Sequence, residues 1–306
     1  MLAWLKRTPK AADQLLGLAP VAGGCALVGV QRQGGAVQLP LGELVATAPG
    51  GAVEPLRERV EALGLQGRPA SLLLAAGDYQ LLLVERPEVP PAELRAAVRW
   101  RIRALVSAPL DSLVVDAFAL PDDAYRGRTP MAYCAVLAQS RMQALADWVT
   151  GAGLRLHSID IPEMALRNLG LLAGADAQNL AVVLLGPRAG LICVQHGAAL
   201  YMARRIEHGL DNRGEGGAQL ALEIQRSLDY FESQLGKGYL SRLLLLPAVE
   251  ADEATLAELG RQLSVRVEQL ALEQLFPGSP LLGLPAAQRA AFLPAIGAAL
   301  RQERGG

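Results

Sequence analysis

Histidine and cysteine are the side chains best able to bind a metal ion or to act as nucleophiles, and here they are few and scattered. The chain has three of each. Cys193 and His196 are a close pair, but on a strand their odd spacing places them on opposite faces, so they could share a metal only across a bulge. Cys25, Cys134 and Cys193 lie far apart and cannot all pair with one another, which is typical of reduced thiols in a cytosolic protein.

Short catalytic motifs are absent from the sequence. There is no HExxH, paired CxxC, GxSxG or Walker A pattern. Gly236-Lys237-Gly238 lacks the upstream glycine of a P-loop and is interpreted as a helix end followed by a turn. The Asp122-Asp123 pair indicates an exposed loop, and Asp160 and Glu163 lie at a helix start, where negative charge stabilises the helix dipole. The sequence therefore does not predict an enzyme.

Four arginines within one predicted helix form a dense group of positive charge: Arg95, Arg99, Arg101 and Arg103. Three of them follow one another at intervals of four residues and lie on one helical face. Two interpretations are open, because the group is either a solvated face or a surface that docks an acidic partner or anionic lipid headgroups. Met1–Lys10 likewise combines apolar and basic side chains, and either contacts a membrane or frays as a free terminus.

The composition limits the class of protein. Of the 306 residues, 51% are hydrophobic and 19% are charged, which excludes a disordered or low-complexity chain. Such a length suggests about two domains or one large one. A chain of this length buries enough surface to fold without disulfides or metals. With 29 basic and 30 acidic residues the net charge is −1, which argues against a general nucleic-acid binder.

The uncharged stretch from Gln14 to Gln31 follows several basic residues and allows two interpretations. One is a secretory or lipoprotein signal with Cys25 as the modified residue. The other is a pair of buried strands with a turn at Gly23-Gly24. Two features favour the strands: Asp13 adjoins the apolar stretch, and no large aliphatic residue lies three positions before the cysteine.

Hydrophobic periodicity in the first part of the chain predicts three strands with tight glycine turns, then a helix and a strand. A further strand, an amphipathic helix, two strands and a helix with Ser140 as its N-cap follow. In order, these elements are expected at 15–18, 25–31, 36–41, 53–63, 71–75, 80–84, 92–106, 113–120, 131–138 and 140–153.

The second part of the chain repeats this pattern. A strand at 156–161 leads into a helix that begins at Pro162. The remaining elements are a second three-strand meander, a helix, a strand, a helix, a strand and a closing helix that is kinked or split at Pro294. They are expected at 180–186, 190–197, 199–207, 220–235, 242–246, 253–263, 265–270 and 286–301. A duplicated unit of three strands, helix, strand and helix is typical of the actin-like and ribonuclease-H-like architecture.

Several stretches resemble the PilM-type actin-like proteins of type IV pilus assembly. Residues 92–120 resemble the inserted subdomain of that family, and AFLPAIGAALR at 291–301 resembles its closing helix. AGLRLHSIDIPEMALRNL and LALEIQRSLDYFESQLG are similar to the PilM-like proteins of the MSHA pilus system. The resemblance extends over most of the chain, but none of these stretches is a catalytic motif.

The resemblance implies an α/β fold with duplicated three-strand-plus-helix actin-like lobes and a small inserted α+β subdomain. We expect the first lobe at 11–88 and 131–160, the inserted subdomain at 89–130 and the second lobe at 161–306. It also implies a cytoplasmic protein at the inner face of the inner membrane. Such proteins dock the short cytoplasmic tail of a PilN-like bitopic inner-membrane protein and belong to a platform with other pilus proteins. The GspL proteins of type II secretion have a similar cytoplasmic domain that acts as a scaffold.

PilM relatives bind ATP between their lobes, so the resemblance also indicates where a nucleotide would lie. An actin-type site uses acidic residues to hold metal-bound water and glycines to let backbone N–H groups approach the phosphates. In the first loop, the family has an aspartate, a glycine and a lysine. Ala19, Val21 and Ala26 occupy those positions here.

The other two nucleotide segments have changed as well. In the second loop Leu184 replaces the aspartate, and Gly186 remains but is followed by Pro187, which has no N–H to donate. Pro247 and Ala248 occupy the positions of the paired glycines on the adenine side. All three segments have lost the groups that the family uses for phosphate and magnesium.

The prediction is therefore a degenerate actin-like scaffold without a cofactor and without ATPase activity. The alternative is an ATP-binding switch of the same machinery that binds ATP with magnesium. In that case Gly23-Gly24 and Arg188 would have to supply replacement contacts to the phosphates. A hairpin turn and a solvated arginine are the favoured interpretation of these residues, since the acidic residues for the metal are missing.

Overall fold

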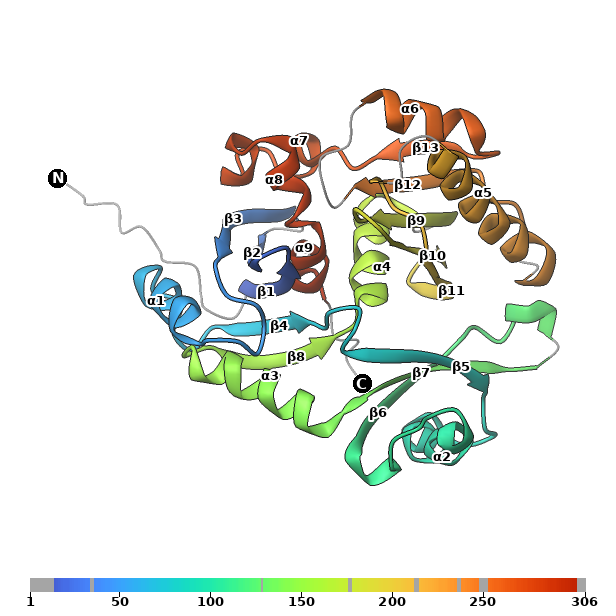
Figure 1. The fold of residues 1–306 in the computed structure, drawn as a ribbon, viewed down its shortest axis with the longest axis horizontal. Helices are drawn as coiled ribbons and strands as arrows, with labels where there is room; N and C mark the ends of the chain where they lie inside the picture. The colour runs from blue at the N-terminus through green and yellow to red at the C-terminus, as the bar shows by residue number, and fades with distance from the viewer. Residues whose placement is uncertain are drawn as a thin grey trace.

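The computed structural model describes residues 14–33, 36–127, 129–175, 178–211, 215–235, 238–247 and 253–301. Two five-stranded sheets lie on either side of a pair of helices, and a third, three-stranded sheet lies beside them (Figure 1). The predictions for Met1–Lys10, Gly236-Lys237 and Ala248 concern residues outside the described ranges. Within those ranges, no helix has the length and apolar character that a membrane span requires.

The first sheet has the strand order β3-β2-β1-β4-β8. Its strands are β1 (Gln14–Val21), β2 (Gly24–Gln33), β3 (Ala36–Val45), β4 (Pro69–Leu73) and β8 (Arg155–Asp160). The first three form an antiparallel meander, and β4 and β8 continue it in parallel. Gly23, in the turn after β1, has a φ of 76°, which favours glycine. The stretch from Gln14 to Gln31 thus forms two strands, as the second of its two interpretations predicted.

The second sheet repeats this order as β11-β10-β9-β12-β13, which confirms the predicted duplication. Its strands are β9 (Asn179–Leu185), β10 (Gly190–His196), β11 (Ala199–Ile206), β12 (Arg242–Pro247) and β13 (Arg266–Gln269). Its outer face is covered by α5 (Glu215–Tyr230), which continues as a π-turn to Leu235, and by α6 (Glu253–Gln262). The outer face of the first sheet packs in the same way against α1 (Glu54–Ala62) and α3 (Gln139–Gly151).

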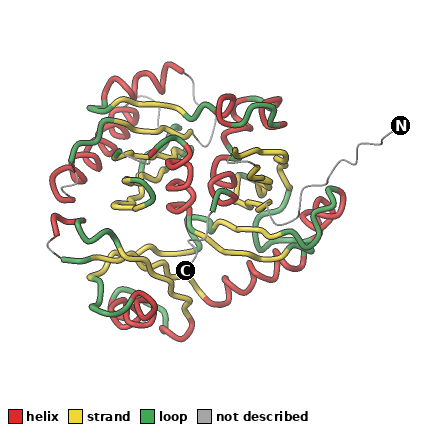
Figure 2. Tube along the Cα trace, turned by 180° about the vertical axis from the view of Figure 1, so that it is seen from behind, coloured by secondary structure: helices red, strands yellow, loops and turns green. Residues whose placement is uncertain are grey.

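Two helices each pack against the sheet of the other half of the chain. α4 (Pro162–Leu172) follows a strand of the first sheet but packs against β9 and β10 of the second. α9 (Leu293–Ala299) ends the second half but packs against β1, β2 and β4. The two helices cross where Gly297 meets Ala165, since a Cβ on Gly297 would lie 2.5 Å from the Ala165 carbonyl oxygen. This exchange makes one continuous core of the two lobes (Figures 1 and 2).

The third sheet has the order β5-β7-β6. Its strands are β5 (Tyr79–Glu85), β6 (Leu113–Ala119) and β7 (Met131–Ala138), and α2 (Leu94–Arg101) packs on the side turned away from the two large sheets (Figure 1). This unit runs over 79–138, whereas the sequence places the inserted subdomain at 89–130. The ranges differ because β5 and β6 both pair with β7, and none of the three strands belongs to the first sheet.

Two details of the helices bear on the sequence predictions. The closing helix is split, as predicted: α8 (Ala286–Ala290) ends before α9, and Pro294 lies in the first turn of α9, where its missing N–H costs nothing. Ser140 as the N-cap of α3 is wrong. The helix begins at Gln139, and Ala138 is the N-cap residue, without a side-chain hydrogen bond.

Candidate functional site

The positions that the resemblance assigns to the first nucleotide loop lie in the hydrophobic core. Ala19 on β1 pairs directly with Ala26 on β2, and both are fully buried. Val21 ends β1 and packs against the same cluster of apolar side chains. A charged aspartate or lysine at these positions would be removed from water among apolar neighbours.

The positions that the resemblance assigns to the nucleotide site in the second lobe adjoin the same cluster. Leu184 on β9 packs against it, and Pro247 ends β12 beside Leu185. The N–H of Gly186 donates to the carbonyl of Ala189 at 2.9 Å, which closes the turn between β9 and β10. The N–H of Gly186 is thus already hydrogen-bonded within its own turn.

Apolar side chains from the C-terminal part of the chain complete this cluster. Leu272 in α7 (Leu272–Leu275), Phe276 and Leu281 are buried in it together with Ala19. A Cβ on Gly42 of β3 would lie 2.1 Å from Leu281, so this segment packs tightly on the first sheet although it follows a strand of the second. The positions assigned to the nucleotide loops are therefore surrounded by hydrocarbon side chains.

The two residues considered for metal binding, Cys193 and His196, have different surroundings. Cys193 is fully buried, and burial raises the pKa of its thiol well above the usual value. Nδ1 of His196 lies 3.1 Å from Oδ1 of Asn179. Among the residues that the structure describes, no group of three or more His, Cys, Asp or Glu side chains could hold a metal ion.

A groove of about 930 Å³ lies elsewhere, where the third sheet meets both lobes. One wall is the strand β6, whose residues from Val114 to Ala119 all line it. The opposite wall comes from the end of β8, the start of α4 and the turn between β10 and β11. Its apolar lining includes Leu74, Phe118, Met142, Ile159, Met164 and Leu200.

The strand β6 is an edge strand with free backbone groups. The N–H of Leu120 donates to the carbonyl of Met131 at 2.9 Å, and the pairing with β7 is regular from Leu113 to Ala119. In an antiparallel pair, residues alternate between facing the partner and facing away. Val115, Ala117 and Ala119 therefore turn their N–H and C=O groups away from β7 and toward the groove. The N–H of Ala117 donates to Oδ1 of Asp116 at 2.9 Å, a bond to a side chain and not to another strand.

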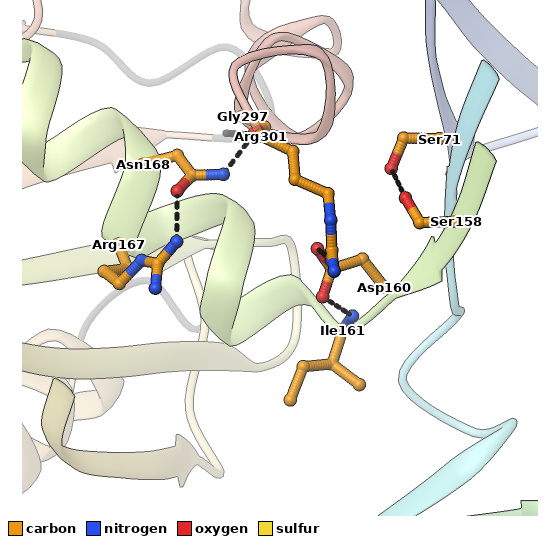
Figure 3. Close-up of polar contacts among 8 residues, drawn as sticks. All are labelled: Ser71, Ser158, Asp160, Ile161, Arg167, Asn168, Gly297 and Arg301. Carbon is orange, nitrogen blue, oxygen red and sulfur yellow. Dashed lines mark hydrogen bonds and ion pairs between the residues drawn. The ribbon is translucent and has the colours of Figure 1, made fainter. Parts of the chain in front are cut away.

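Charged side chains surround the opposite wall (Figure 3). Arg301, just after α9, donates from Nη1 to Oδ2 of Asp160 at 2.5 Å. Oδ1 of Asp160 accepts the N–H of Ile161 at 2.9 Å, which fixes the carboxylate at the start of α4. Arg167 donates to Asn168 at 2.8 Å, and Asn168 donates to the carbonyl of Gly297 at 2.8 Å. These bonds hold the arginines at the groove by tying α4 to the end of α9.

Two pairs of polar side chains near the groove are engaged with each other. The hydroxyls of Ser71 and Ser158 are 2.7 Å apart between β4 and β8, and Asp160 is bound by Arg301 (Figure 3). Among the described residues that line the groove, no hydroxyl or thiol is paired with a histidine base, as nucleophilic catalysis would need. A free strand edge, an apolar lining and charged side chains at the rim are instead the features of a site for an extended peptide.

The four arginines predicted to bind a partner have different surroundings in the structure. Arg95 lines the groove. Arg99 donates to the carbonyls of Leu110 and Leu113 at 2.7 and 3.3 Å, so it stabilises its own subdomain. Arg101 pairs with Glu85 at 3.4 Å, and Arg103 is exposed.

The sequence did not identify the other groove residues. Arg167 and Arg301 are single arginines in helical stretches with no motif around them. One local feature of the sequence could have indicated the strand edge at the groove. A charged residue such as Asp116 within an apolar strand is typical of a protected sheet edge.

No protein-family model matches the sequence, and a comparison with curated proteins finds no match. Solved structures of similar fold are found. The PilM–PilN type IV pilus biogenesis complex contains a chain that is 20% identical, with a TM-score of 0.70 over 94% of this chain and 97% of that one.

Two further structures resemble the chain over nearly its whole length. The cytoplasmic domain of EpsL, an inner-membrane component of the type II secretion system of Vibrio cholerae, is 15% identical, with a TM-score of 0.53 over 90% of this chain and 98% of that one. A Bacteroides thetaiotaomicron protein with an actin-like ATPase fold is 9% identical, with a TM-score of 0.52 over 94% of this chain and 98% of that one. The fold of this chain is therefore the actin-like α/β fold that the sequence predicted.

Proposed function

We propose that this chain is a platform component of a type IV pilus or related secretion machine. In this proposal it binds the short cytoplasmic tail of a PilN-like inner-membrane protein in the groove beside β6. The likeness to the PilM chain of a PilM–PilN complex over most of both chains supports this assignment. The observation that carries it is the free edge of β6 along an apolar groove with Arg95, Arg167 and Arg301 at its rim.

The mode of binding follows from the strand edge. An extended tail can add to β6 as a further strand and accept and donate hydrogen bonds at Val115, Ala117 and Ala119. Its apolar side chains would enter the groove, and its acidic groups would meet the arginines at the rim. The protein would then act as a scaffold at the cytoplasmic face of the inner membrane. The resemblance of two sequence stretches favours an MSHA-type pilus within this class.

A proline substitution tests this mode of binding. Ala117→Pro removes an N–H that faces the groove, but it leaves the ladder to β7 intact because edge strands tolerate proline there. Binding of a fluorescent peptide with the sequence of the PilN-like tail should fall about tenfold or more, since one hydrogen bond is lost and the approach of the strand is hindered. Glu85→Pro, on the other free edge of the same sheet, is the matched control and should bind normally.

Two results would contradict the proposal. The first is equal peptide affinity of the wild type and Ala117→Pro. The second is the absence of any binding by a wild-type chain that is folded by circular dichroism, together with normal piliation in a strain that lacks the gene.

A second function remains, in which the chain is an ATP-binding switch of the same machinery. The likeness to a protein with an actin-like ATPase fold favours it, and the apolar cluster around Ala19 and Leu184 opposes it. Calorimetry with millimolar ATP and magnesium discriminates between the two. We expect no saturable heat, and a clear isotherm would favour the switch.

A further inference from the structure

α2 has two chemically different sides. Leu94, Val98 and Ile102 are buried against the third sheet, together with Val115 and Val136. At 100° per residue, Trp100 lies almost opposite to this buried side. Its side chain is 73% exposed, although indole is among the more apolar side chains. The packing of the subdomain therefore does not explain why a tryptophan stands at this position.

The residues around Trp100 share a surface. Ala96 lies one turn before it, and Arg103 and Ala104 lie one turn after it, in the 3-10 turn Ile102–Ala104 that continues α2. All of them are exposed. No acidic residue occurs from Leu94 to Leu110. We name the set Ala96, Trp100, Arg103 and Ala104 the α2 outer face.

From this arrangement we infer that the α2 outer face binds the surface of an anionic lipid bilayer. A helix that lies flat on its sheet presents its outer side parallel to a planar surface, and α2 lies on the side of the third sheet turned away from both lobes (Figure 1). Tryptophan is enriched at the level of the lipid headgroups, where its ring is partly buried and its N–H stays hydrated. Arg103 beside it can keep its guanidinium group at the anionic headgroups.

The geometry also places the groove beside the membrane. Arg95 lines the groove and lies on the same helix, five residues before Trp100, which is about 8 Å along the axis. A bilayer at the α2 outer face would thus lie next to the groove. The inference goes beyond the proposed function and does not rest on it, since lipid alone suffices for the contact.

The test uses the full chain and lipid vesicles without any protein partner. Vesicles of equal parts phosphatidylglycerol and phosphatidylcholine should co-sediment the wild-type chain, and vesicles of phosphatidylcholine alone should bind it far more weakly. Trp100→Ala should lower the partition coefficient about tenfold, because the indole no longer leaves water. Arg103→Gln should lower it about fivefold, and added salt should weaken wild-type binding.

Tyr239→Ala is the matched control, because Tyr239 is 87% exposed but lies on the second lobe. Its vesicle binding should equal that of the wild type. All variants change exposed side chains, and their melting temperatures should agree with that of the wild type. The absence of binding to anionic vesicles would overturn the inference. So would binding that survives in Trp100→Ala and disappears when residues 1–13 are deleted.

Two crossed measurements separate this inference from the proposed function. Trp100→Ala should bind the tail peptide with wild-type affinity, and Ala117→Pro should bind vesicles with the wild-type partition coefficient. Loss of both activities in either variant would show that the two surfaces are not independent, and would contradict the assignment of lipid binding to the α2 outer face.

Discussion

The hydroxyl of Tyr79 donates a hydrogen bond of 2.6 Å to Oε2 of Glu163, and this bond joins the third sheet to the start of α4. Both side chains are buried. The guanidinium of Arg205 lies 5.9 Å from the centre of the Tyr79 ring and donates to the carbonyl of Ala76. A single buried contact thus brings together the inserted subdomain, α4 and the edge strand of the second sheet.

This contact predicts a specific dependence of stability on pH. Burial raises the pKa of Glu163, while the hydrogen bond from Tyr79 and the charge of Arg205 partly oppose the rise, and Asp160 adds to it. The folded chain therefore holds the carboxyl proton more tightly than the unfolded chain. Its contribution is fully present below the ordinary pKa of glutamate and is lost as pH rises through the raised pKa.

Glu163→Gln removes this titration but keeps an oxygen that accepts from Tyr79. The free energy of unfolding of the wild type should therefore fall relative to that of Glu163→Gln as pH rises from about 4 toward neutrality. Urea unfolding of both chains over this range measures the difference between their free energies of unfolding. The contributions of titrating groups that the two chains share cancel in this difference. A difference that is independent of pH would contradict the predicted raised pKa.

Loss of the Tyr79 hydroxyl should lower the free energy of unfolding at neutral pH. Tyr79→Phe leaves the buried carboxylate of Glu163 without its donor, and the free energy of unfolding should fall by about 1–3 kcal/mol. Chemical denaturation gives this value. Tyr239→Phe, at a site that is 87% exposed, is the control and should change stability little. Equal stability of the two variants would mean that the hydrogen bond contributes nothing to folding.

The crossing of α9 over the first sheet depends on a glycine. A Cβ on Gly17 would lie 2.0 Å from the carbonyl oxygen of Ala295, and backbone atoms cannot move aside as a flexible side chain can. Gly17→Ala should therefore lower the free energy of unfolding by about 1–3 kcal/mol or more. Gly77→Ala is the matched control, because no atom lies within 4 Å of its added Cβ. If both variants melted at the same temperature, the close approach of α9 to β1 would be refuted.

Local sequence patterns predicted the parts of the fold that local chemistry determines. The strands around Gly23, the helix start at Pro162 and the split near Pro294 each follow from a turn residue or a proline. The partners of β5 and β7 could not be predicted in this way. Their nearly continuous apolar runs suit either sheet, and only the pairing of β7 with β5 and β6 decides between them.

The groove was unpredictable for a related reason. Asp160 and Arg301 are 141 residues apart in the sequence, and neither belongs to a motif. They meet because α9 crosses to the lobe opposite its own sheet, a consequence of the tertiary packing of Gly17 and Gly297. The arginine group of α2 could be recognised from the sequence. Only the structure shows that Arg99 bonds to backbone carbonyls of its own subdomain whereas Arg95 lines the groove.

The apolar cluster between the lobes predicts the outcome of restoring an acidic residue. Ala19→Asp places the family's aspartate at a fully buried site among hydrocarbon side chains. The free energy of unfolding should fall by several kcal/mol, because the carboxylate loses water without gaining a partner. Ala22→Asp adds the same side chain at the exposed turn after β1 and should leave stability nearly unchanged. Neither variant should melt at a higher temperature when ATP and magnesium are added, since a ligand stabilises only a state that it binds. A saturable rise in the melting temperature of Ala19→Asp with Mg-ATP would instead show that one carboxylate suffices to recover the site, and that the apolar cluster opens to admit a nucleotide.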